Sequence, residues 1–516
     1  MTRPIVHLHP DDSIVVAARD LTAGESIDLG EGSVVVRQPV GLGHKLAIAP
    51  VAPGAPVRKY GQVIGYATLP IEVGDHVHSH NLTNGDAQGD PAPCTAIPES
   101  PARISGRTFL GYRRHSGKIG TRNYLAVIST VNCSATVSKA VARHFTRERL
   151  APFPHVDGVI ALTHHGGCAM QYQGQGHKML NRVLGGMARH PNIGGYLLIG
   201  LGCEQVTIGL LMQEQKLVQL GPPGANGVAA RSGPPVFVMQ DLGGTAATIS
   251  AAIAEAERLL PLVDAARREP CDASALILGT ECGGSDGNSG VTANPAVGIA
   301  ADRIVACGGT AILSETTEIF GAEHLLTRRA RTPEIAAKLL ERIAWWRWYA
   351  GLYGVELDNN PSVGNKAGGL TTIAEKSLGA VAKGGSTALE GVYDYAEPID
   401  RRGFVVMDTP GYDPPSVTGM VAGGANLIVF TTGRGSCFGC KPVPSLKVAS
   451  NSPMYRRMEA DMDVDAGTIL DGESVEAVGE RIFEKLLATA SGEPTKSEAQ
   501  GIGDEEFVPW IVGPVL

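Results

Sequence analysis

The sequence predicts an α/β protein in which a small N-terminal all-β module precedes two α/β domains with largely parallel sheets. Three observations lead to this prediction. Residues 1–85 contain only strand-length apolar segments, residues 111–516 alternate strand-length and helix-length segments, and a polar break at 267–271 divides that second region. A chain of 516 residues has room for three domains of ordinary size.

Short segments of β character make up residues 1–85. Glycine and proline separate them, and no helical period of useful length occurs. The next stretch, 86–110, is polar and rich in proline and glycine, which is typical of a linker. The expected strands of the module are Ser13–Ala18, Ser33–Arg37, Lys45–Pro50 and Val63–Ala67.

Strands and helices alternate after residue 110, which predicts βαβ units. Such units connect parallel strands, so the domains 111–270 and 271–516 should both hold largely parallel sheets, and the tail after Gly492 should be less ordered. The expected strands are Tyr124–Thr130, Gly158–Thr163, Gly195–Gly200, Val236–Met239, Ala275–Gly279, Thr310–Ser314, Phe404–Met407 and Leu427–Phe430. The expected helices are Thr136–Leu150, His177–His190, Ala246–Arg268 and Pro333–Tyr353.

Composition excludes several classes of protein. The chain has 44 basic and 52 acidic residues, a formal net charge of −8, whereas a general nucleic-acid binder needs a basic surface. No apolar run approaches the roughly 18 residues of a membrane helix, and Asp11 and Asp12 interrupt any secretory signal. An odd number of cysteines, 9, spread over a long chain indicates a reducing compartment. We therefore expect a cytoplasmic protein that binds neither nucleic acid nor membrane, and we expect a homo-oligomer such as a dimer.

Five expected strands end in polar, glycine-rich loops. In open parallel sheets ligands bind beyond the carboxyl ends of the strands, so these loops can assemble one site. Glycine-rich loops are also common without a ligand, and that alternative stays open. The loops read THHGGCAM (163–170), GLGCEQ (200–205), GTECGGSDGNSG (279–290), SETTEI (314–319) and TTGRGSCFG (431–439).

Cysteines recur at these strand ends. Cys168, Cys203 and Cys282 each stand beside glycine, and Cys133 follows another strand. Each one alone is most simply a buried small hydrophobic residue. Together they favour a metal site, with Fe2+ as the expected cofactor and Mn2+ or an iron–sulfur cluster as alternatives. None of the four forms a C-x-x-C pair, so a zinc finger is excluded.

Histidines and carboxylates provide candidate bases and further ligands. A histidine or a carboxylate at a strand end can remove a proton or hold a metal ion. Two module histidines, His9 and His44, are alternative metal ligands, although the module's histidines equally fit a solvated strand edge. The candidate catalytic residues are His44, His164, Glu315, Glu318 and Lys366. Further acidic candidates are Glu204, Glu281 and Asp286, the last with helix capping as its alternative role.

Cationic and amide side chains complete an anion-binding pattern. Asn365 and Lys366 lie in a glycine loop that opens a helix, where backbone N–H groups favour anions. No loop matches a nucleotide-binding motif. The candidate substrate-binding residues are Lys45, Asp286, Asn365, Arg434 and Lys447. Because proton removal beside a carboxylate needs metal or cations, the pattern predicts a lyase or isomerase of a hydroxy acid, with a non-catalytic binding protein as the alternative.

Several motifs resemble those of the altronate/galactarate dehydratase family, from about Gly111 to Gly467. The N-terminal module, with GHK at 43–45 and KYGQVIGYA at 59–67, resembles the SAF domain fused to these enzymes, and GDHVHSHN is similar to the altronate branch. By motif position the resemblance extends to His44, Lys45, His164, Cys168, Cys203, Glu204, Cys282, Asp286, Glu315, Glu318, Asn365, Lys366, Arg434 and Lys447. It implies Fe2+-dependent dehydration of a sugar acid, an aldonate such as altronate or an aldarate such as galactarate, to a 2-keto-3-deoxy acid. Some relatives instead eliminate sulfite from sulfolactate. The motifs are GYRRHSGKIGTRNYLAVISTVNCS, THHGGC, GLGCE, ECGGSDGNSGVTANPAVG, SETTEIFGAEHLL, NPSVGNKAGGLTTIAEKSLG and FTTGRG followed by VPSLKVASN.

Two further expectations concern single regions. Cys437 and Cys440 form a C-x-x-C that departs from the family pattern, and it is a redox or metal pair or a local substitution in a buried loop. The β module is expected to fold over the site as a mobile cap that brings His44 and Lys45 to the substrate, with a merely tethered domain as the alternative.

Overall fold

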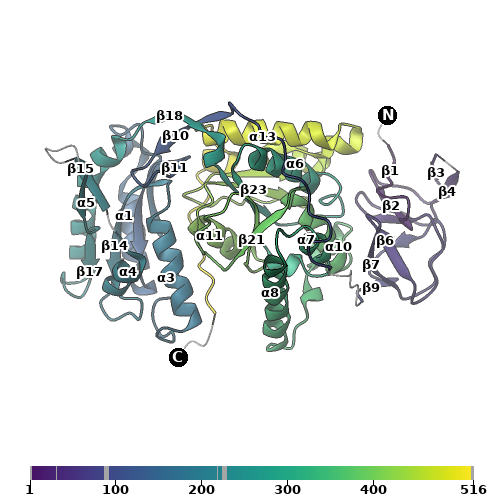
Figure 1. Cartoon of the computed structure of the whole chain (residues 1–516), viewed down its shortest axis with the longest axis horizontal. Helices are drawn as coiled ribbons and strands as arrows, with labels where there is room; N and C mark the ends of the chain where they lie inside the picture. Colours follow the sequence, from purple (N-terminus) through teal and green to yellow (C-terminus); the bar gives the residue numbers. More distant parts are fainter. Residues whose placement is uncertain (1–2, 31, 86–91, 218, 224–228, 513–516) are drawn as a thin grey trace.

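The computed structural model confirms the predicted fold class, with an all-β module and two α/β domains (Figure 1). It describes the chain except for residues 1–2, 31, 86–91, 218, 224–228 and 513–516. The first α/β domain lies at the left of Figure 1, the second in the centre and the β module at the right. No helix in this described part is long and apolar enough to cross a membrane.

The β module packs firmly onto the second α/β domain. Val15 and Ala17 lie in a core of the module's own, whereas Ile14 and Val16 lie in a core that continues to Leu378 of that domain. Alternate residues of one strand therefore face two different cores. All strand pairs of the module are antiparallel. The strands are β1 (Ile5–Val6), β2 (Ile14–Ala17), β3 (Ser26–Asp28), β4 (Ser33–Val35), β5 (Lys45–Ala47), β6 (Pro56–Lys59), β7 (Gln62–Ala67), β8 (His76–Val77) and β9 (Leu82–Thr83).

The expected linker is a bound segment where it is described. The amide of Cys94 donates to the carbonyl of Thr327 (3.1 Å), and the amide of Ile104 donates to that of Ala306 (3.0 Å). A strand begins at Thr108, three residues before the expected end of the linker. Three short antiparallel strands then join the two α/β domains: β10 (Thr108–Arg113), β11 (Ile119–Gly120) and β18 (Arg268–Asp272).

The first α/β domain has a four-stranded parallel sheet in the order β13-β12-β14-β17. Leu125 and Val127 face a core with α1 and α5, whereas Ala126 and Ile128 face a core with α3 and α4. Both faces are covered, which explains the continuous apolar strand sequences. The elements are β12 (Tyr124–Ser129), η1 (Asn132–Ser134), α1 (Ala135–His144), α2 (Arg147–Leu150), β13 (Gly158–Leu162), α3 (Gln175–Ala188), β14 (Ile193–Gly200), α4 (Ile208–Gln215), β15 (Gln219–Pro223), β16 (Ala229–Ser232), β17 (Val236–Val238) and α5 (Thr245–Asp264).

The second α/β domain has a seven-stranded parallel sheet in the order β21-β22-β20-β19-β23-β24-β25. Helices α6 and α13 share a core with one face, and α11 shares a core with the other. The strands are β19 (Ile277–Cys282), β20 (Thr310–Leu313), β21 (Leu389–Tyr393), β22 (Gly403–Met407), β23 (Leu427–Thr432), β24 (Ser445–Ala449) and β25 (Val464–Asp465). The α-helices are α6 (Ala293–Ala306), α7 (His324–Thr327), α8 (Pro333–Gly351), α9 (Val363–Ala367), α10 (Ile373–Ala380), α11 (Asp413–Gly423), α12 (Ser452–Arg457), α13 (Val475–Ala490) and α14 (Lys496–Ala499).

Some elements were not predicted, among them the helices α6 and α11. Both are rich in small residues and buried on nearly all sides, so they lack the polar face that marks an amphipathic helix. The expectation for the tail is also wrong. Residues 493–512 are packed, and Trp510 stacks on Trp346 with ring centroids 4.8 Å apart.

Candidate active site

The candidate site lies where the strand order reverses in the seven-stranded sheet. The chain runs from β19 to β20 on one side and later returns to β23 on the other side of β19. Ligands of open α/β sheets bind beyond the carboxyl ends of strands at such a switch point. Cys282 is the last residue of β19, and Glu315 follows the end of β20 by two residues.

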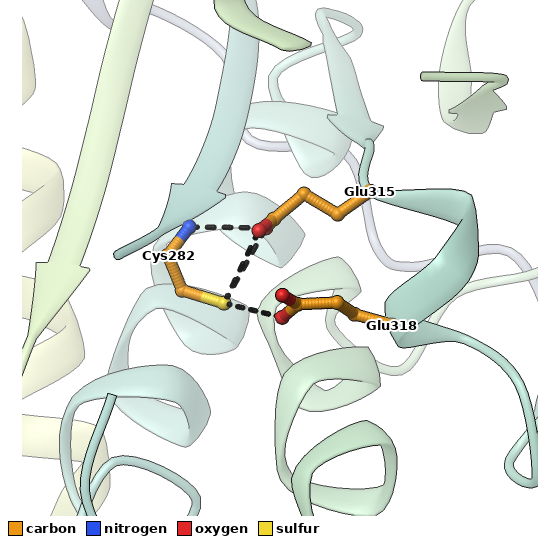
Figure 2. A group of neighbouring side chains, drawn as sticks. All are labelled: Cys282, Glu315 and Glu318. Carbon is orange, nitrogen blue, oxygen red and sulfur yellow. Dashed lines mark hydrogen bonds between the residues drawn. The ribbon is translucent and has the colours of Figure 1, made fainter. Parts of the chain in front are cut away.

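Cys282, Glu315 and Glu318 form a buried triad (Figure 2). The Sγ atom of Cys282 lies 3.3 Å from Oε2 of Glu315 and 3.4 Å from Oε2 of Glu318. The backbone N–H of Cys282 also donates to Glu315 Oε2 (3.0 Å). Glu315 has φ +61°, a left-handed conformation that costs a non-glycine residue roughly 1–3 kcal/mol. Strain of this kind is typical of a functional position.

Two buried lysines neutralise the triad. Lys383 donates to Glu315 Oε2, and Lys376 Nζ lies 2.6 Å from Glu318 Oε1. Burial is the main cause that raises the pKa of the Cys282 thiol and of Glu315. Burial also acts on Glu318, but Lys376 and Lys383 outweigh it and lower the pKa of that carboxyl. Without a metal, the triad and the two lysines therefore form two ion pairs beside a thiol.

A second acidic group, Glu281 and Asp413, meets the same Glu315, with carboxylate oxygens within 4.8 Å of one another. Burial, and then the charge of Glu315, raises the pKa of Asp413 to about 7 and that of Glu281 well above its usual range. Oε2 of Glu281 accepts hydrogen bonds from Ser314 (2.9 Å) and Ser416 (2.7 Å). Within the described part of the chain, Oε1 of Glu281 is buried without a partner. Proton-carrying carboxyls thus lie beside the triad.

The donor set fits a divalent transition metal. It combines one thiolate-capable sulfur with carboxylate oxygens, a set that iron and manganese accept more readily than magnesium or calcium would. Thiols deprotonate when they coordinate a metal, so a bound ion would hold Cys282 as a thiolate. Among the residues described, the triad and the Glu281 group are the sets of three such donors that are close enough to share an ion.

A small enclosed cavity of about 10 Å³ borders the triad. It has room for about one water molecule. Its walls include Cys282, Ser285, Lys376 and, from the β module, Tyr60. The hydroxyl of Ser285 and both amide atoms of Asn288 are buried and find no hydrogen-bond partner among the described residues. Unpaired buried polar atoms are costly, so they indicate a polar ligand.

Three predicted substrate-binding residues support loops instead. Oδ1 of Asp286 accepts a hydrogen bond from Ser450 (2.8 Å) and others from its own loop. Asn365 caps α9 and donates to the carbonyl of Ser285 (2.8 Å). Nζ of Lys447 donates to the carbonyl of Phe438 (2.9 Å) and is fully buried. These contacts hold the loops in place, and the substrate-binding roles of the three residues stay predictions.

Lys366 and Arg434 remain available to an anion. Arg434 is exposed, and its backbone amide joins the 279–290 loop through the carbonyl of Gly284 (2.8 Å). Lys366 is half-buried on α9, next to the Asn365 that holds Ser285. Both cationic residues therefore stand on segments that contact the 279–290 loop.

Lys45 joins the β module to the second α/β domain rather than facing a substrate. Its Nζ lies 2.9 Å from Oε2 of Glu375, and Nζ of Lys59 lies 2.9 Å from Oε1. All three side chains are fully buried. Burial lowers the pKa of Lys45 to about 8, whereas the two lysines outweigh burial and hold the pKa of Glu375 well below its usual range.

Glycines allow the module to approach closely. A Cβ on Gly287 would lie 1.9 Å from the carbonyl oxygen of Gly43, and a Cβ on Gly369 would lie 2.5 Å from the same atom. No side chain fits either position. The GHK turn therefore contacts the strand-end loops, as predicted. The buried ion pairs and the shared core hold the module in a fixed position there.

The histidines of the module cluster at this contact. Nδ1 of His44 lies 3.0 Å from Nε2 of His76, and Nε2 of His78 lies 2.9 Å from the carbonyl of Lys366. Burial lowers the pKa of His44, His76 and His78, that of His76 to about 3. These imidazoles are neutral near pH 7. Neither His9 nor His44 belongs to a group of three metal-capable side chains in the described chain.

His164 lies in the first α/β domain, away from the triad. It donates through Nε2 to the carbonyl of Ser129 (3.0 Å) and accepts through Nδ1 from the amide of Gly166 (3.1 Å). Burial lowers its pKa to about 4. Both nitrogens are engaged, so His164 positions its loop and the predicted catalytic role is not supported by this geometry. Glu204 is likewise engaged, by Thr130 (2.9 Å).

The predicted four-cysteine site divides into two places. Cys133, Cys168 and Cys203 are exposed at strand ends of the first α/β domain, while Cys282 is buried in the triad of the second. Cys437 is exposed and Cys440 buried, and both are free thiols.

Sequence reasoning missed the two lysines and the aspartate beside the triad. Lys383 stands in SLGAVAKGG, where a single charged residue among small apolar ones is a signal for a paired buried charge. The sequence around Lys376 and Asp413 contains no such signal.

Comparisons with known proteins cover the whole chain. Three family models match it in turn: the altronate/galactarate dehydratase SAF domain at residues 3–85, the D-galactarate dehydratase/altronate hydrolase second domain at 111–264, and the D-galactarate/altronate dehydratase C-terminal domain at 273–515.

Curated relatives agree with these matches. The chain is 34% identical to an altronate dehydratase of Escherichia coli over 494 residues, 96% of each chain. It is 34% identical to a galactarate dehydratase (L-threo-forming) of the same organism over 505 residues, 97% of this chain and 95% of the relative. It is 32% identical to a (2R)-sulfolactate sulfo-lyase subunit beta of Chromohalobacter salexigens over 412 residues, 78% of this chain and 97% of the relative. Since the matches span nearly all of the chain, the protein belongs to the altronate/galactarate dehydratase family of hydro-lyases.

Proposed function

We propose that the protein dehydrates a sugar acid, an aldonate such as altronate or an aldarate such as galactarate, to the 2-keto-3-deoxy acid with the help of Fe2+ or Mn2+. The observation that carries this proposal is the buried triad of Cys282, Glu315 and Glu318 at the switch point of the sheet. The names of two relatives supply the substrate class.

The reaction removes the proton on the carbon next to the carboxylate and expels the hydroxyl group from the following carbon as water. The resulting enol becomes the 2-keto acid. Glu315 is the candidate base, because burial raises the pKa of its carboxyl and a higher pKa makes a carboxylate a stronger base. Asp413, with a pKa of about 7, can carry the proton that the departing hydroxyl group needs.

Cations hold the negative charge of the substrate and of the enolate. Lys376 lies at the cavity wall, and Lys366 and Arg434 stand on the segments around it. The unpaired Ser285 hydroxyl and Asn288 amide offer hydrogen bonds to substrate hydroxyls. A metal ion held by Cys282, Glu318 and one carboxylate oxygen of Glu315 would polarise a substrate oxygen as a Lewis acid when bound, and the other oxygen of Glu315 would remain for the proton.

A six-carbon acid does not fit a cavity of about 10 Å³. Substrate entry therefore requires the loops around Ser285 and Lys366 to move while the β module keeps its contact through Lys45, Lys59 and Glu375. Closure around the substrate would then exclude water from the intermediate.

An anaerobic assay of a panel of hexonates and hexarates, with added Fe2+, tests the proposal through carbonyl reagents that detect the keto acid. We expect product from at least one acid, loss of more than about 100-fold in kcat for Glu318→Gln, and near-normal turnover for Cys271→Ser, a buried cysteine outside the site. A panel without product would overturn the proposal. Sulfite released from sulfolactate would show a sulfo-lyase instead, and tight sugar-acid binding without turnover would show a binding protein.

A further inference from the structure

Three exposed cysteines meet at one edge of the first α/β domain. Cys133 follows β12, Cys168 follows β13 and Cys203 follows β14, and these strands are neighbours in the order β13-β12-β14. Free cysteine is among the most buried residue types, and Cys271, Cys282, Cys307 and Cys440 of this chain follow that rule. The exposure of three cysteines at equivalent strand ends therefore calls for a function.

The three loops are tied to one another through the residues before Cys168. The carbonyl of Gly166 accepts from the amide of Asn132 (3.0 Å), next to Cys133, and the carbonyl of Gly167 accepts from the amide of Gln205 (2.8 Å), two residues after Cys203. A Cβ on Gly167, at φ +96°, would lie 2.4 Å from the carbonyl of Thr130. The glycines thus fix the three cysteine loops against one another.

The Cys168 loop borders a pocket of about 210 Å³ that no residue of the proposed active site lines. Ala169 and Gln173 in this loop have left-handed φ angles of +52° and +57°, which stores strain at this position. The pocket is also lined by His165 and His177. His177 is 1% exposed, and its Nδ1 atom has no hydrogen-bond partner in the described part of the chain. A buried nitrogen without a partner points to a ligand in the pocket.

We propose that Cys133, Cys168 and Cys203 together hold an iron–sulfur cluster beside this pocket. A single ion is a poorer fit, because two ligands with metal–sulfur bonds of about 2.3 Å can lie no more than about 4.6 Å apart. The described chain contains no group of three donors within 4.8 Å of one another that includes any of these cysteines. A cluster spreads its thiolates over several irons, so it accepts sulfurs that stand further apart.

The proposed cluster binds through three thiolates, and each thiol gives its proton to solvent. In a four-iron cluster three thiolates leave one iron without a protein thiolate. The pocket lined by His165 and His177 offers that iron an oxygen or nitrogen ligand from solvent or a small molecule. This site shares no residue with the Cys282 triad, so it goes beyond the proposed function.

Anaerobic reconstitution of the full chain with equal amounts of ferrous and ferric iron and with sulfide tests the proposal without any activity assay. We expect about four irons and about four acid-labile sulfides per chain, an absorbance shoulder in the visible and an electron paramagnetic resonance signal after reduction. Cys133→Ser, Cys168→Ser and Cys203→Ser should each lose most of the sulfide and the signal. Cys437→Ser, an exposed cysteine of the other α/β domain, and Cys282→Ser should keep both.

Circular dichroism melting curves show whether each variant is folded, and we expect little change because the three side chains are exposed. Bound iron without acid-labile sulfide would indicate a single metal ion and would overturn the proposal of a cluster. Unchanged sulfide in any one of the three variants, or its loss in Cys437→Ser, would remove the assignment of these ligands. A disulfide between two of the cysteines in the anaerobically purified protein would contradict the proposal as well.

Discussion

The thiol sulfur of Cys282 lies 3.3 Å from a carboxylate oxygen of Glu315, although the two residues end different strands. Lys383 binds the same oxygen from a third segment of the domain. A thiol, a carboxylate and an ammonium group thus lie together in the buried interior. Burying charged groups costs free energy unless every charge is paired. The arrangement persists because each charged partner compensates another.

This pairing predicts an unequal effect of single and double substitutions. Glu315→Gln leaves Lys383 buried without its carboxylate, so it should lower the free energy of unfolding by about 3–5 kcal/mol. The double variant Glu315→Gln with Lys383→Met should recover much of this stability while remaining inactive. Denaturant unfolding measures the first effect and keto-acid formation the second.

The matched control is the exposed pair Arg303 and Glu480, where Glu480→Gln should change stability by less than about 1 kcal/mol. Equal losses in the single and double variants at the triad would show that the carboxylate contributes by packing rather than by its charge.

The contact between the β module and the 279–290 loop should be essential for turnover. Gly287→Ala places a Cβ 1.9 Å from the carbonyl oxygen of Gly43, so the module must shift. We expect at least a tenfold loss of kcat and faster proteolysis between the module and the second α/β domain, with the α/β domains still folded. Gly209→Ala, an exposed helix position with no atom within 4 Å of the new Cβ, should keep full activity. Normal turnover in Gly287→Ala would show that the module is not part of the site.

His190 predicts how stability depends on pH. Burial lowers its pKa from 6.5 to about 3 in the folded chain. Between these values the unfolded chain binds a proton that the folded chain does not, so stability should fall as the pH drops below 6.5, by about 2 kcal/mol at pH 5. The variant His190→Gln should lose this share of the pH dependence of unfolding and keep the shares of His76 and His164, although it will be less stable at pH 8.

His115→Gln, at an exposed position, serves as the control and should keep the wild-type slope. A wild-type slope in His190→Gln would mean that other groups cause the acid sensitivity.

Much of the fold could be predicted because strands such as β12 and β23 are continuous apolar runs that end in glycine-rich loops. The helices α6 and α11 escaped prediction, since helices buried on nearly all sides carry no amphipathic period. The expected linker carries the composition of a flexible segment, yet backbone hydrogen bonds hold it, and composition does not report backbone partners.

The site was predicted in part for a similar reason. Glu315 and Glu318 stand in one short motif, and Cys282 ends a neighbouring strand, so their residue types and positions mark them. Lys376 and Asp413 reach the same cluster from two helices, and nothing in the sequence indicates that these helices lie beside it. The ion pair of Lys45 could not be predicted, because its partner Glu375 lies 330 residues away.

The most direct test of the central claim is the initial rate of keto-acid formation by metal-depleted protein as Fe2+ is added under anaerobic conditions. Altronate and galactarate are the substrates, and wild type is compared with Glu318→Gln. The account predicts a rate that rises from near zero and saturates in wild type, and a rate at least about 100-fold lower at every iron concentration in the variant. A rate independent of added iron, or equal saturating rates in the two proteins, would contradict it.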